Sequence, residues 1–284
     1  MALTMLNYGM ESQAGITVIT GEVGSGKTTL TREILHNMGS DITVGLISNA
    51  HSLFGDVFQW VLMAFDLKAE KNDKAGCYQV FTDFLIKEYS ENKRTVLIID
   101  EAQNLDMDTL EELRLLSNIN ADKHLVLQLV LVGQPELLEM MQRHELRQLA
   151  QRVSVDYKLK ALGYKETTAY IRHRLVIAGG KSNLFDKYAA AIVYYHSGGI
   201  PRLINTLCDF ALVYGYAEEV KRINSKLMLC VIKDKLQGGI FPIVTNENKE
   251  QAVIRQLFKR DKGIDIVPLP DLSEDDALKT ILKL

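Results

Sequence analysis

The feature that most constrains this chain is a glycine-rich segment, Gly21-Glu22-Val23-Gly24-Ser25-Gly26-Lys27-Thr28. It follows a β-branched run at residues 16–20 and precedes a stretch of helical apolar spacing from Lys27 to Met38. A strand that passes through such a segment straight into a helix is typical of an open α/β sheet and not of a helical bundle or an all-β sandwich. The chain must therefore form a tight loop at the carboxyl end of its first strand.

The same segment has the spacing G-x-x-x-x-G-K-[ST] of a Walker A phosphate loop. Its glycines let backbone N–H groups turn inward toward phosphate oxygens, and the helix dipole adds positive potential there. We expect Lys27 to contact the β- and γ-phosphates of a nucleotide and the Thr28 hydroxyl to bind Mg²⁺. The predicted nucleotide-binding residues are Gly21, Glu22, Val23, Gly24, Ser25, Gly26, Lys27 and Thr28, with Thr29 beside them.

Further strands alternate with helices along the first half of the chain, which predicts a doubly wound parallel sheet. Ser52 or Asp56 is the expected cap of the second helix. The predicted strands are residues 16–20, 43–47, 95–99, 125–132 and 153–157, and further helices are expected around Val57–Phe65, at 78–89 and from Asp106.

After Leu162 the pattern becomes purely helical. Residues 165–177, 186–196, 201–216 and 224–235 predict a small all-α domain. From residue 237 onward Gly238, Gly239 and three prolines break regular structure, leaving a partly flexible tail with a predicted helix at 247–260. We therefore expect an α/β nucleotide-binding domain at 1–157, a helical lid at 158–236 and a tail at 237–284.

Composition excludes several classes of protein. A hydrophobic fraction of 47% in 284 residues supplies a core, and 33 basic against 36 acidic residues give no global sign of nucleic-acid binding. Three widely spaced cysteines argue against a disulfide framework or a zinc knuckle. The apolar stretches are too short for a bilayer span, which needs about 20 residues. We expect a cytoplasmic protein without membrane insertion, recruited to the inner membrane, if at all, by a partner.

Two acids follow the predicted third strand. Val96 to Ile99 runs into Asp100 and Glu101, at the strand end where α/β sheets bind ligands. We expect Asp100 to orient Mg²⁺ through its water shell and Glu101 to polarise the attacking water, which favours hydrolysis over transfer to a metabolite. The alternative is an acidic turn that leads into the helix at Asp106.

Polar side chains elsewhere are candidates for sensing the nucleotide. Gln134 ends the fourth strand, where it would touch the attacking water or the γ-phosphate; the alternative is an N-cap before Pro135. Arg147 and Arg152 precede the fifth strand, where one of them would reach a neighbouring subunit's nucleotide as an arginine finger; the alternative is a solvated helix end. Arg202 begins a lid helix, from which it would fold over the γ-phosphate; the alternative is a surface arginine.

With these residues in place, the chain resembles an AAA+ ATPase of the general secretion pathway protein A (ExeA-like) family. The matching stretches are I-T-G-E-V-G-S-G-K-T-T-L, V-L-I-I-D-E-A-Q-N-L, L-V-G-Q-P-E-L, L-R-Q-L-A-Q-R-V and G-G-I-P-R-L-I-N-T-L-C-D, which span Ile19 to Asp209. The resemblance implies a sheet in the order 5-1-4-3-2, Asp100 and Glu101 as Walker B, Gln134 as sensor 1, Arg152 as the preferred finger and Arg202 as sensor 2.

The resemblance also sets expectations for function. Family members carry an N-terminal segment that helps cradle adenine, and the secretion members continue into a transmembrane helix and a peptidoglycan-binding domain. These segments have no counterpart in the sequence from Met1 to Leu284, so we expect the chain to resemble the soluble, stand-alone members. We expect an ATP-binding and Mg²⁺-dependent ATP-hydrolysing switch that forms homo-oligomers and supports assembly of a secretion, pilus or exopolysaccharide export system through a protein partner. The alternatives are a DNA-binding regulator of the TniB type, suggested by the basic run Lys158, Lys160, Lys165, Arg172 and Arg174, and a nucleotide-gated scaffold with little turnover.

Overall fold

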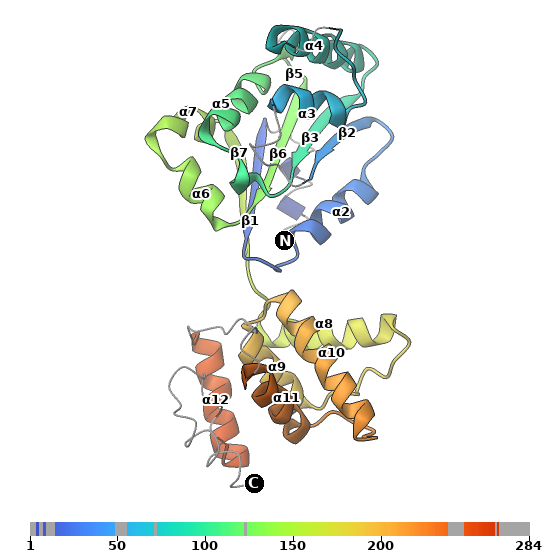
Figure 1. Cartoon of the computed structure of the whole chain (residues 1–284), viewed down its shortest axis with the longest axis vertical. Helices are drawn as coiled ribbons and strands as arrows, with labels where there is room; N and C mark the ends of the chain where they lie inside the picture. Colours follow the sequence, from blue (N-terminus) through green and yellow to red (C-terminus); the bar gives the residue numbers. More distant parts are fainter. Residues whose placement is uncertain are drawn as a thin grey trace. The chain divides into compact units, whose positions relative to one another are not determined.

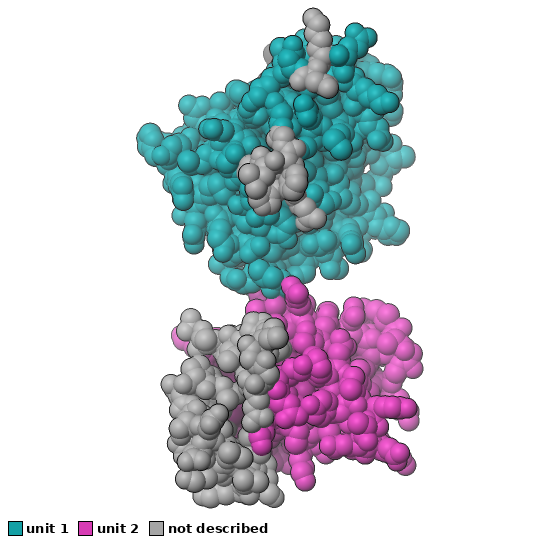
Figure 2. Space-filling view, in the orientation of Figure 1, with its two compact units in different colours: residues 1–160 teal, residues 161–284 magenta. Residues whose placement is uncertain are grey.

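The chain forms two compact units in the computed structural model, residues 1–160 and residues 161–284 (Figure 2). The structure describes residues 4–5, 8–9, 15–48, 56–70, 73–121, 124–237, 247–264 and 266. Each unit has its own hydrophobic core. The first unit ends three residues beyond the predicted α/β boundary at residue 157.

The first unit is built on a five-stranded parallel sheet (Figure 1). Its strands are β1 (Ile16–Gly21), β2 (Ile42–Ile47), β3 (Arg94–Ile99), β6 (Leu127–Gly133) and β7 (Val153–Leu159). They lie in the order β2-β3-β6-β1-β7. Because β6 is the fourth predicted strand and β7 the fifth, this order is the expected 5-1-4-3-2, and the predicted P-loop α/β fold is confirmed.

Helices cover both faces of this sheet, as a parallel sheet requires. They are α2 (Lys27–Asn37), α3 (Val57–Ala64), α4 (Lys74–Ser90), α5 (Met107–Leu116), α6 (Pro135–Met141) and α7 (Arg147–Ala150), with short 3₁₀ turns η2 (Ala102–Asn104) and η3 (His144–Leu146). Helix α2 packs on one face, and α3 to α7 pack on the other.

The alternation of side chains along β3 shows how both faces are filled. Val96 and Ile98 pack with Ile34 of α2, whereas Leu97 and Ile99 join the larger core beneath α3, α4 and α5. Successive strand residues point to opposite faces, so a continuous apolar run is needed when both faces are buried. All four side chains are at most 1% exposed.

The predicted strand at 125–132 divides into two. Its first residue belongs to β5 (His124–Leu125), which pairs antiparallel with β4 (Asn120–Ala121), and the sheet strand β6 begins at Leu127. An apolar run carries no signal that separates a hairpin arm from a sheet strand, so the prediction merged them.

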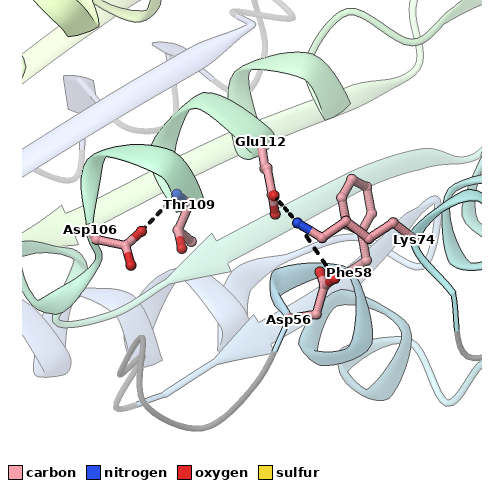
Figure 3. A network of polar contacts seen from close by, with 6 residues as sticks. All are labelled: Asp56, Phe58, Lys74, Asp106, Thr109 and Glu112. Carbon is pink, nitrogen blue, oxygen red and sulfur yellow. Dashed lines mark hydrogen bonds and ion pairs between the residues drawn. The ribbon is translucent and has the colours of Figure 1, made fainter.

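A polar network ties α3, α4 and α5 together (Figure 3). Asp56 caps α3 by accepting a hydrogen bond from the Phe58 N–H at 3.0 Å, which confirms one of the two expected caps; Ser52 lies outside the described residues. Lys74, at the start of α4, forms an ion pair with Glu112 of α5 and lies 3.8 Å from Asp56. Such exposed pairs contribute little energy, and the three helices are held mainly by the apolar core that they share.

The second unit is helical, as expected of the lid. It contains α8 (Tyr164–Ile177), α9 (Lys187–Ser197), α10 (Pro201–Ala217), α11 (Ser225–Gln237) and α12 (Lys249–Lys262). Most side chains of α9 are buried, and this helix packs against α8, α10, α11 and α12. Helix α9 therefore forms the centre of this unit. None of the helices that the structure describes is both long and apolar enough to cross a bilayer.

Helix α12 lies within the range assigned to the tail, yet it packs into the core of the second unit. Its Ile254 and Phe258 are 4% and 2% exposed. Gln251 donates to the Tyr195 carbonyl oxygen at 2.6 Å, and the Tyr194 hydroxyl donates to Glu250 at 2.7 Å. The helix is therefore held by apolar and polar contacts together. The acidic segment at 271–276 and the last four residues lie outside the described part of the chain.

Candidate nucleotide site

Three neighbouring strands bring the predicted site residues to one edge of the sheet. Strands β1, β6 and β3 are parallel and adjacent, and they end at Gly21, Gly133 and Ile99. The phosphate loop, Gln134 and the acidic pair at 100–101 follow directly. The carboxyl edge of a parallel sheet is where α/β proteins bind ligands.

The phosphate loop has the backbone that its glycines predict. Gly24 has φ 78° and Gly26 has φ 101°, in the left-handed region that favours glycine. A Cβ atom on Gly21 would lie 2.7 Å from the Ser25 Oγ, so the loop also needs a bare backbone where it leaves the strand. Gly26 caps α2 without a side-chain hydrogen bond, which leaves the N–H groups of the first helical turn available to an anion.

Lys27 lies inside the curl of this loop. It is only 6% exposed, and its Nζ donates to the carbonyl oxygens of Gly21 at 2.7 Å and of Glu22 at 3.2 Å. A buried ammonium group needs polar partners, and here the loop's own backbone supplies them. The cation is thereby held where a phosphate group in the loop would meet it.

Thr28 contacts the acidic strand end directly. Its Oγ1 donates to Asp100 Oδ2 at 3.3 Å, and Asp100 Oδ1 accepts from the Glu101 N–H at 2.9 Å. Asp100 is 7% exposed and Thr28 is open to solvent. A hydroxyl and a carboxylate at this distance are the oxygen ligands that Mg²⁺ prefers in nucleotide sites.

The residues present fit a magnesium nucleotide. The Ser25 Oγ is buried and has no hydrogen-bond partner among the residues that the structure describes. A buried hydroxyl ordinarily has a hydrogen-bond partner. The Ser25 hydroxyl lies in the phosphate loop beside Lys27. The donors of the loop suit phosphate oxygens, and the oxygens of Thr28 and Asp100 suit Mg²⁺.

Glu101 occupies a left-handed backbone position, with φ 55° and ψ 38°. This conformation costs a non-glycine residue about 1–3 kcal/mol, so the surroundings must hold it there. The turn η2 follows at once, with the Asn104 N–H donating to the Glu101 carbonyl oxygen at 3.0 Å. The Glu101 side chain accepts from Gln103 Nε2 at 2.7 Å and from Gln134 Nε2 at 3.3 Å.

Gln103 is the site residue that sequence reasoning missed. Its amide bonds to Glu101 through Nε2 and accepts from the Gln134 N–H through Oε1 at 2.9 Å. No sequence pattern pointed to it, because its contact with Glu101 depends on the left-handed backbone of Glu101 and the turn that follows. In the structure, a Cβ on Gly133 would lie 2.9 Å from Gln103 Oε1.

The interpretation of Gln134 as an N-cap holds for its backbone, whereas its contact with the attacking water or the γ-phosphate stays a prediction. Its backbone stands at the N-cap of α6, before Pro135, but its side chain makes no capping bond. That side chain instead donates to the Glu101 carboxylate. Gln134 therefore starts the helix with its backbone and contacts the predicted catalytic acid with its amide.

The arginines before β7 lie at the opposite edge of the sheet. Val153 pairs with Ile16 and Leu159 with Gly21, so Arg152 stands beside the beginning of β1 and the phosphate loop beside its end. Five residue steps at about 3.3 Å separate these edges by about 16 Å. Arg147 and Arg152 are both exposed. An arginine there is poorly placed for its own site and free to meet another molecule.

Arg202 lies in the second unit, in the first turn of α10, and is exposed. The segment before it has a demanding backbone: Gly199 has φ 77°, and a Cβ there would lie 1.8 Å from the Leu162 carbonyl oxygen. A positive charge at a helix N-terminus interacts unfavourably with the helix dipole, so the stability of α10 does not explain an arginine at this position. The contact between Arg202 and a γ-phosphate stays a prediction.

Comparison with known proteins finds relatives of this chain. Residues 10–141 match the family described as AAA domain, and 225 residues, 78% of the chain, are 39% identical to general secretion pathway protein A of Aeromonas hydrophila. The chain therefore contains an AAA domain. It is related to general secretion pathway protein A and spans 41% of the length of that relative.

Solved structures share the fold of this AAA protein at low sequence identity. The ORC2 protein of Aeropyrum pernix matches with a TM-score of 0.57 and 17% identity, over 100% of this chain and 84% of that one. Cdc6p from Pyrobaculum aerophilum gives 0.60 and 14%, over 84% and 69% of the two chains. A RuvB mutant of Thermotoga maritima gives 0.51 and 18%, over 81% and 68%. These similarities concern the fold alone.

Proposed function

We propose that this AAA protein binds ATP and hydrolyses it in a Mg²⁺-dependent reaction. The observation that carries the proposal is the contact of Thr28 with Asp100 at 3.3 Å, because it joins the phosphate loop to the acidic strand end. Glu101 follows Asp100 directly, next to the same loop. The donors for a nucleotide, the oxygens for a cation and a carboxylate base are thus gathered at one edge of the sheet.

Each residue has a role that follows from its position. The phosphate loop at residues 21–28 binds the phosphates through its available backbone N–H groups and the Lys27 ammonium, and Thr29 lies beside it. Glu101 orients the attacking water and takes its proton, and Gln134 contacts Glu101 and senses the γ-phosphate. Thr28 and Asp100 hold Mg²⁺, which, when bound, neutralises charge on the β- and γ-phosphates.

A second molecule completes the site in this proposal. Arg152 stands about 16 Å along the strand direction from its own phosphate loop, at the other edge of the sheet. An arginine finger supplied by a neighbour contributes about 10³- to 10⁵-fold in rate. A single subunit is therefore slow, and a homo-oligomer is faster. Arg202 serves as a sensor that links the γ-phosphate to the helical unit.

The cycle serves as an assembly switch for a secretion, pilus or exopolysaccharide export system. Support comes from the relative, whose name assigns it to the general secretion pathway. The protein acts in the cytoplasm in this proposal and reaches the inner membrane through a protein partner. Size measurement with ATP, ADP and no nucleotide tests the switch, and an identical size in all three states would contradict it.

The direct test of hydrolysis compares phosphate release by the wild-type protein with that of Lys27→Ala. We expect Mg²⁺-dependent release well above the Lys27→Ala background. Turnover equal to that background would instead support the nucleotide-gated scaffold.

The basic run considered for a DNA-binding regulator divides between the two units. Lys158 and Lys160 belong to the first, and Lys165, Arg172 and Arg174 to the second, all of them exposed. Among the described residues of the two units, no contact favours a nucleic-acid partner over a solvated surface, so the run carries no second proposal. A salt-sensitive mobility shift of duplex DNA in the presence of ATP would instead support a DNA-binding regulator.

A further inference from the structure

We infer that Gln103 is a positioning residue for hydrolysis, which holds the Glu101 carboxylate in its working orientation and joins it to the start of α6. The inference rests on the proposed ATPase function and adds a residue to that site. Gln103 lies two residues after Glu101 in the turn η2 and bonds to groups on both sides of the site.

Both ends of the Gln103 amide form hydrogen bonds. Nε2 donates to Glu101 Oε2 at 2.7 Å, and Oε1 accepts from the Gln134 N–H at 2.9 Å. A carboxylate accepts only and a backbone N–H donates only, so these partners fix which end of the amide is which. Nε2 also lies 3.4 Å from Asn104 Oδ1. The side chain therefore has one orientation that satisfies all three contacts.

Gly133, at the end of β6, leaves space for this amide. A Cβ on Gly133 would lie 2.9 Å from Gln103 Oε1 and from Leu137 Cδ2. Gly133 is the last residue of β6, so its bare backbone lets the amide reach the N–H of Gln134. The strand end and the turn are thus shaped around the Gln103 side chain.

The contacts also select which carboxylate oxygen is held. Within the described residues, both side-chain hydrogen bonds of the Glu101 carboxylate, from Gln103 and Gln134, end on Oε2. Two amide donors on one oxygen fix the plane of the carboxylate and leave Oε1 to accept the proton of the attacking water. The 2.7 Å contact from Gln103 is the shorter of the two, so Gln103 supplies the stronger restraint.

Loss of this restraint affects rate and not binding. Glu101 touches the attacking water in the proposed reaction, and a misplacement of about 1 Å at a reacting group costs about 100-fold. Among the described residues, none of the hydrogen bonds of Gln103 goes to the phosphate loop, so the affinity for ATP should not depend on it. A residue that merely supported the fold would instead lower stability and nucleotide binding together.

The test is Gln103→Met, which keeps the length of the side chain and removes its hydrogen bonds. We expect kcat to fall about 10- to 100-fold, with KM and the dissociation constant for an ATP analogue within twofold of wild type. Gln142→Met is the matched control, because Gln142 is an exposed glutamine at the other end of α6, and it should keep wild-type kinetics.

The results that would overturn this inference differ from those that would overturn the proposed function. A wild-type kcat in Gln103→Met, a higher kcat, or a KM and ATP-analogue dissociation constant that worsen as much as kcat would each overturn the positioning role. If Gln103→Met does not fold, Gln103→Asn, which is one methylene too short to bridge both partners, is judged by the same readouts. A wild-type protein that releases no more phosphate than Lys27→Ala would overturn the proposed function itself, whereas turnover that ignores Gln103 overturns only this inference.

Discussion

Thr28 Oγ1 donates a hydrogen bond to Asp100 Oδ2 at 3.3 Å, although 72 positions separate the two residues in the chain. The contact joins the first turn of α2 to the end of β3, on neighbouring parts of one sheet edge. It is the link on which magnesium binding depends in the proposed function.

Removal of the Thr28 hydroxyl should therefore weaken the effect of Mg²⁺ on ATP binding. Thr28→Val keeps the shape of the side chain and removes an oxygen ligand, and even second-shell losses at metal sites cost about 10- to 100-fold in affinity. We expect Mg²⁺ to strengthen ATP binding at least tenfold less in this variant than in wild type. Titration of a fluorescent ATP analogue with and without Mg²⁺ measures it.

Thr82→Val is the control for that change, because the Thr82 hydroxyl donates to the Tyr78 carbonyl oxygen at 2.8 Å on the far helix α4. It should bind ATP and Mg²⁺ like wild type. An unchanged Mg²⁺ effect in Thr28→Val would remove Thr28 from the metal site.

Much of this site was predictable because its residues follow strand ends. The β-branched run before Gly21 and the apolar run before Asp100 are local patterns, and parallel strands bring their carboxyl ends together. Gln103 was not predictable in the same way. Its contact with Glu101 depends on a left-handed residue followed by a 3₁₀ turn, and neither has a sequence pattern of its own.

The fold likewise has features that the sequence reveals and features that it does not. Lys27 and Asp56 mark helix starts through loop and capping chemistry that is visible in the sequence. The start of β6 was not visible, because Leu125 and Leu127 are equally apolar and only pairing with β4 separates them. The packing of α12 on α9 depends on long-range contacts of Tyr194 and Tyr195, which composition cannot predict.

The arginine finger can be tested by mixing two inactive proteins. Arg152→Ala retains a complete phosphate loop and Glu101, and Glu101→Gln retains Arg152. If the finger acts between subunits, each variant should be slow alone and their mixture should recover part of the wild-type rate. Phosphate release across mixing ratios measures the recovery.

Wild-type specific activity should also rise with protein concentration, whereas that of Arg152→Ala should stay flat. Arg143→Ala, an exposed arginine before η3, is the control and should follow wild type. If Arg147→Ala and not Arg152→Ala is slow alone and regains activity when mixed with Glu101→Gln, the finger is Arg147. Activity of Arg152→Ala equal to wild type, with no effect of mixing, would exclude Arg152.

Helix α12 should contribute strongly to the stability of the second unit. Phe258 is 2% exposed and its ring meets that of Tyr188 edge-on, with centroids 5.5 Å apart. Phe258→Ala should lower the free energy of unfolding by about 3–5 kcal/mol. Urea unfolding followed by circular dichroism measures it. Val253→Ala, at a side chain 55% exposed, should change stability little; equal effects would show that α12 is not packed as described.

The stability of the second unit should also depend on His196 in acid. Burial lowers the pKa of His196 from 6.5 to about 4. Between these values the unfolded chain binds a proton on this side chain and the folded chain does not, so its contribution to stability is complete above pH 6.5 and is lost as the pH falls toward 4. The melting temperature of wild type should therefore fall more steeply over this range than that of His196→Gln.

His173→Gln provides the comparison for that pH series, since His173 is exposed on α8. It should follow the wild-type curve. Parallel curves for wild type and His196→Gln would show that His196 titrates equally in the folded and unfolded chain.

The central claim is that the loop at Lys27 binds ATP and the carboxylate of Glu101 hydrolyses it. The most direct measurement is ATP binding and phosphate release, side by side, for wild type, Lys27→Ala and Glu101→Gln. We predict that wild type does both, that Lys27→Ala loses both, and that Glu101→Gln binds ATP as wild type does while its turnover falls to the Lys27→Ala background. Normal turnover in Glu101→Gln, or no turnover in wild type, would contradict the account.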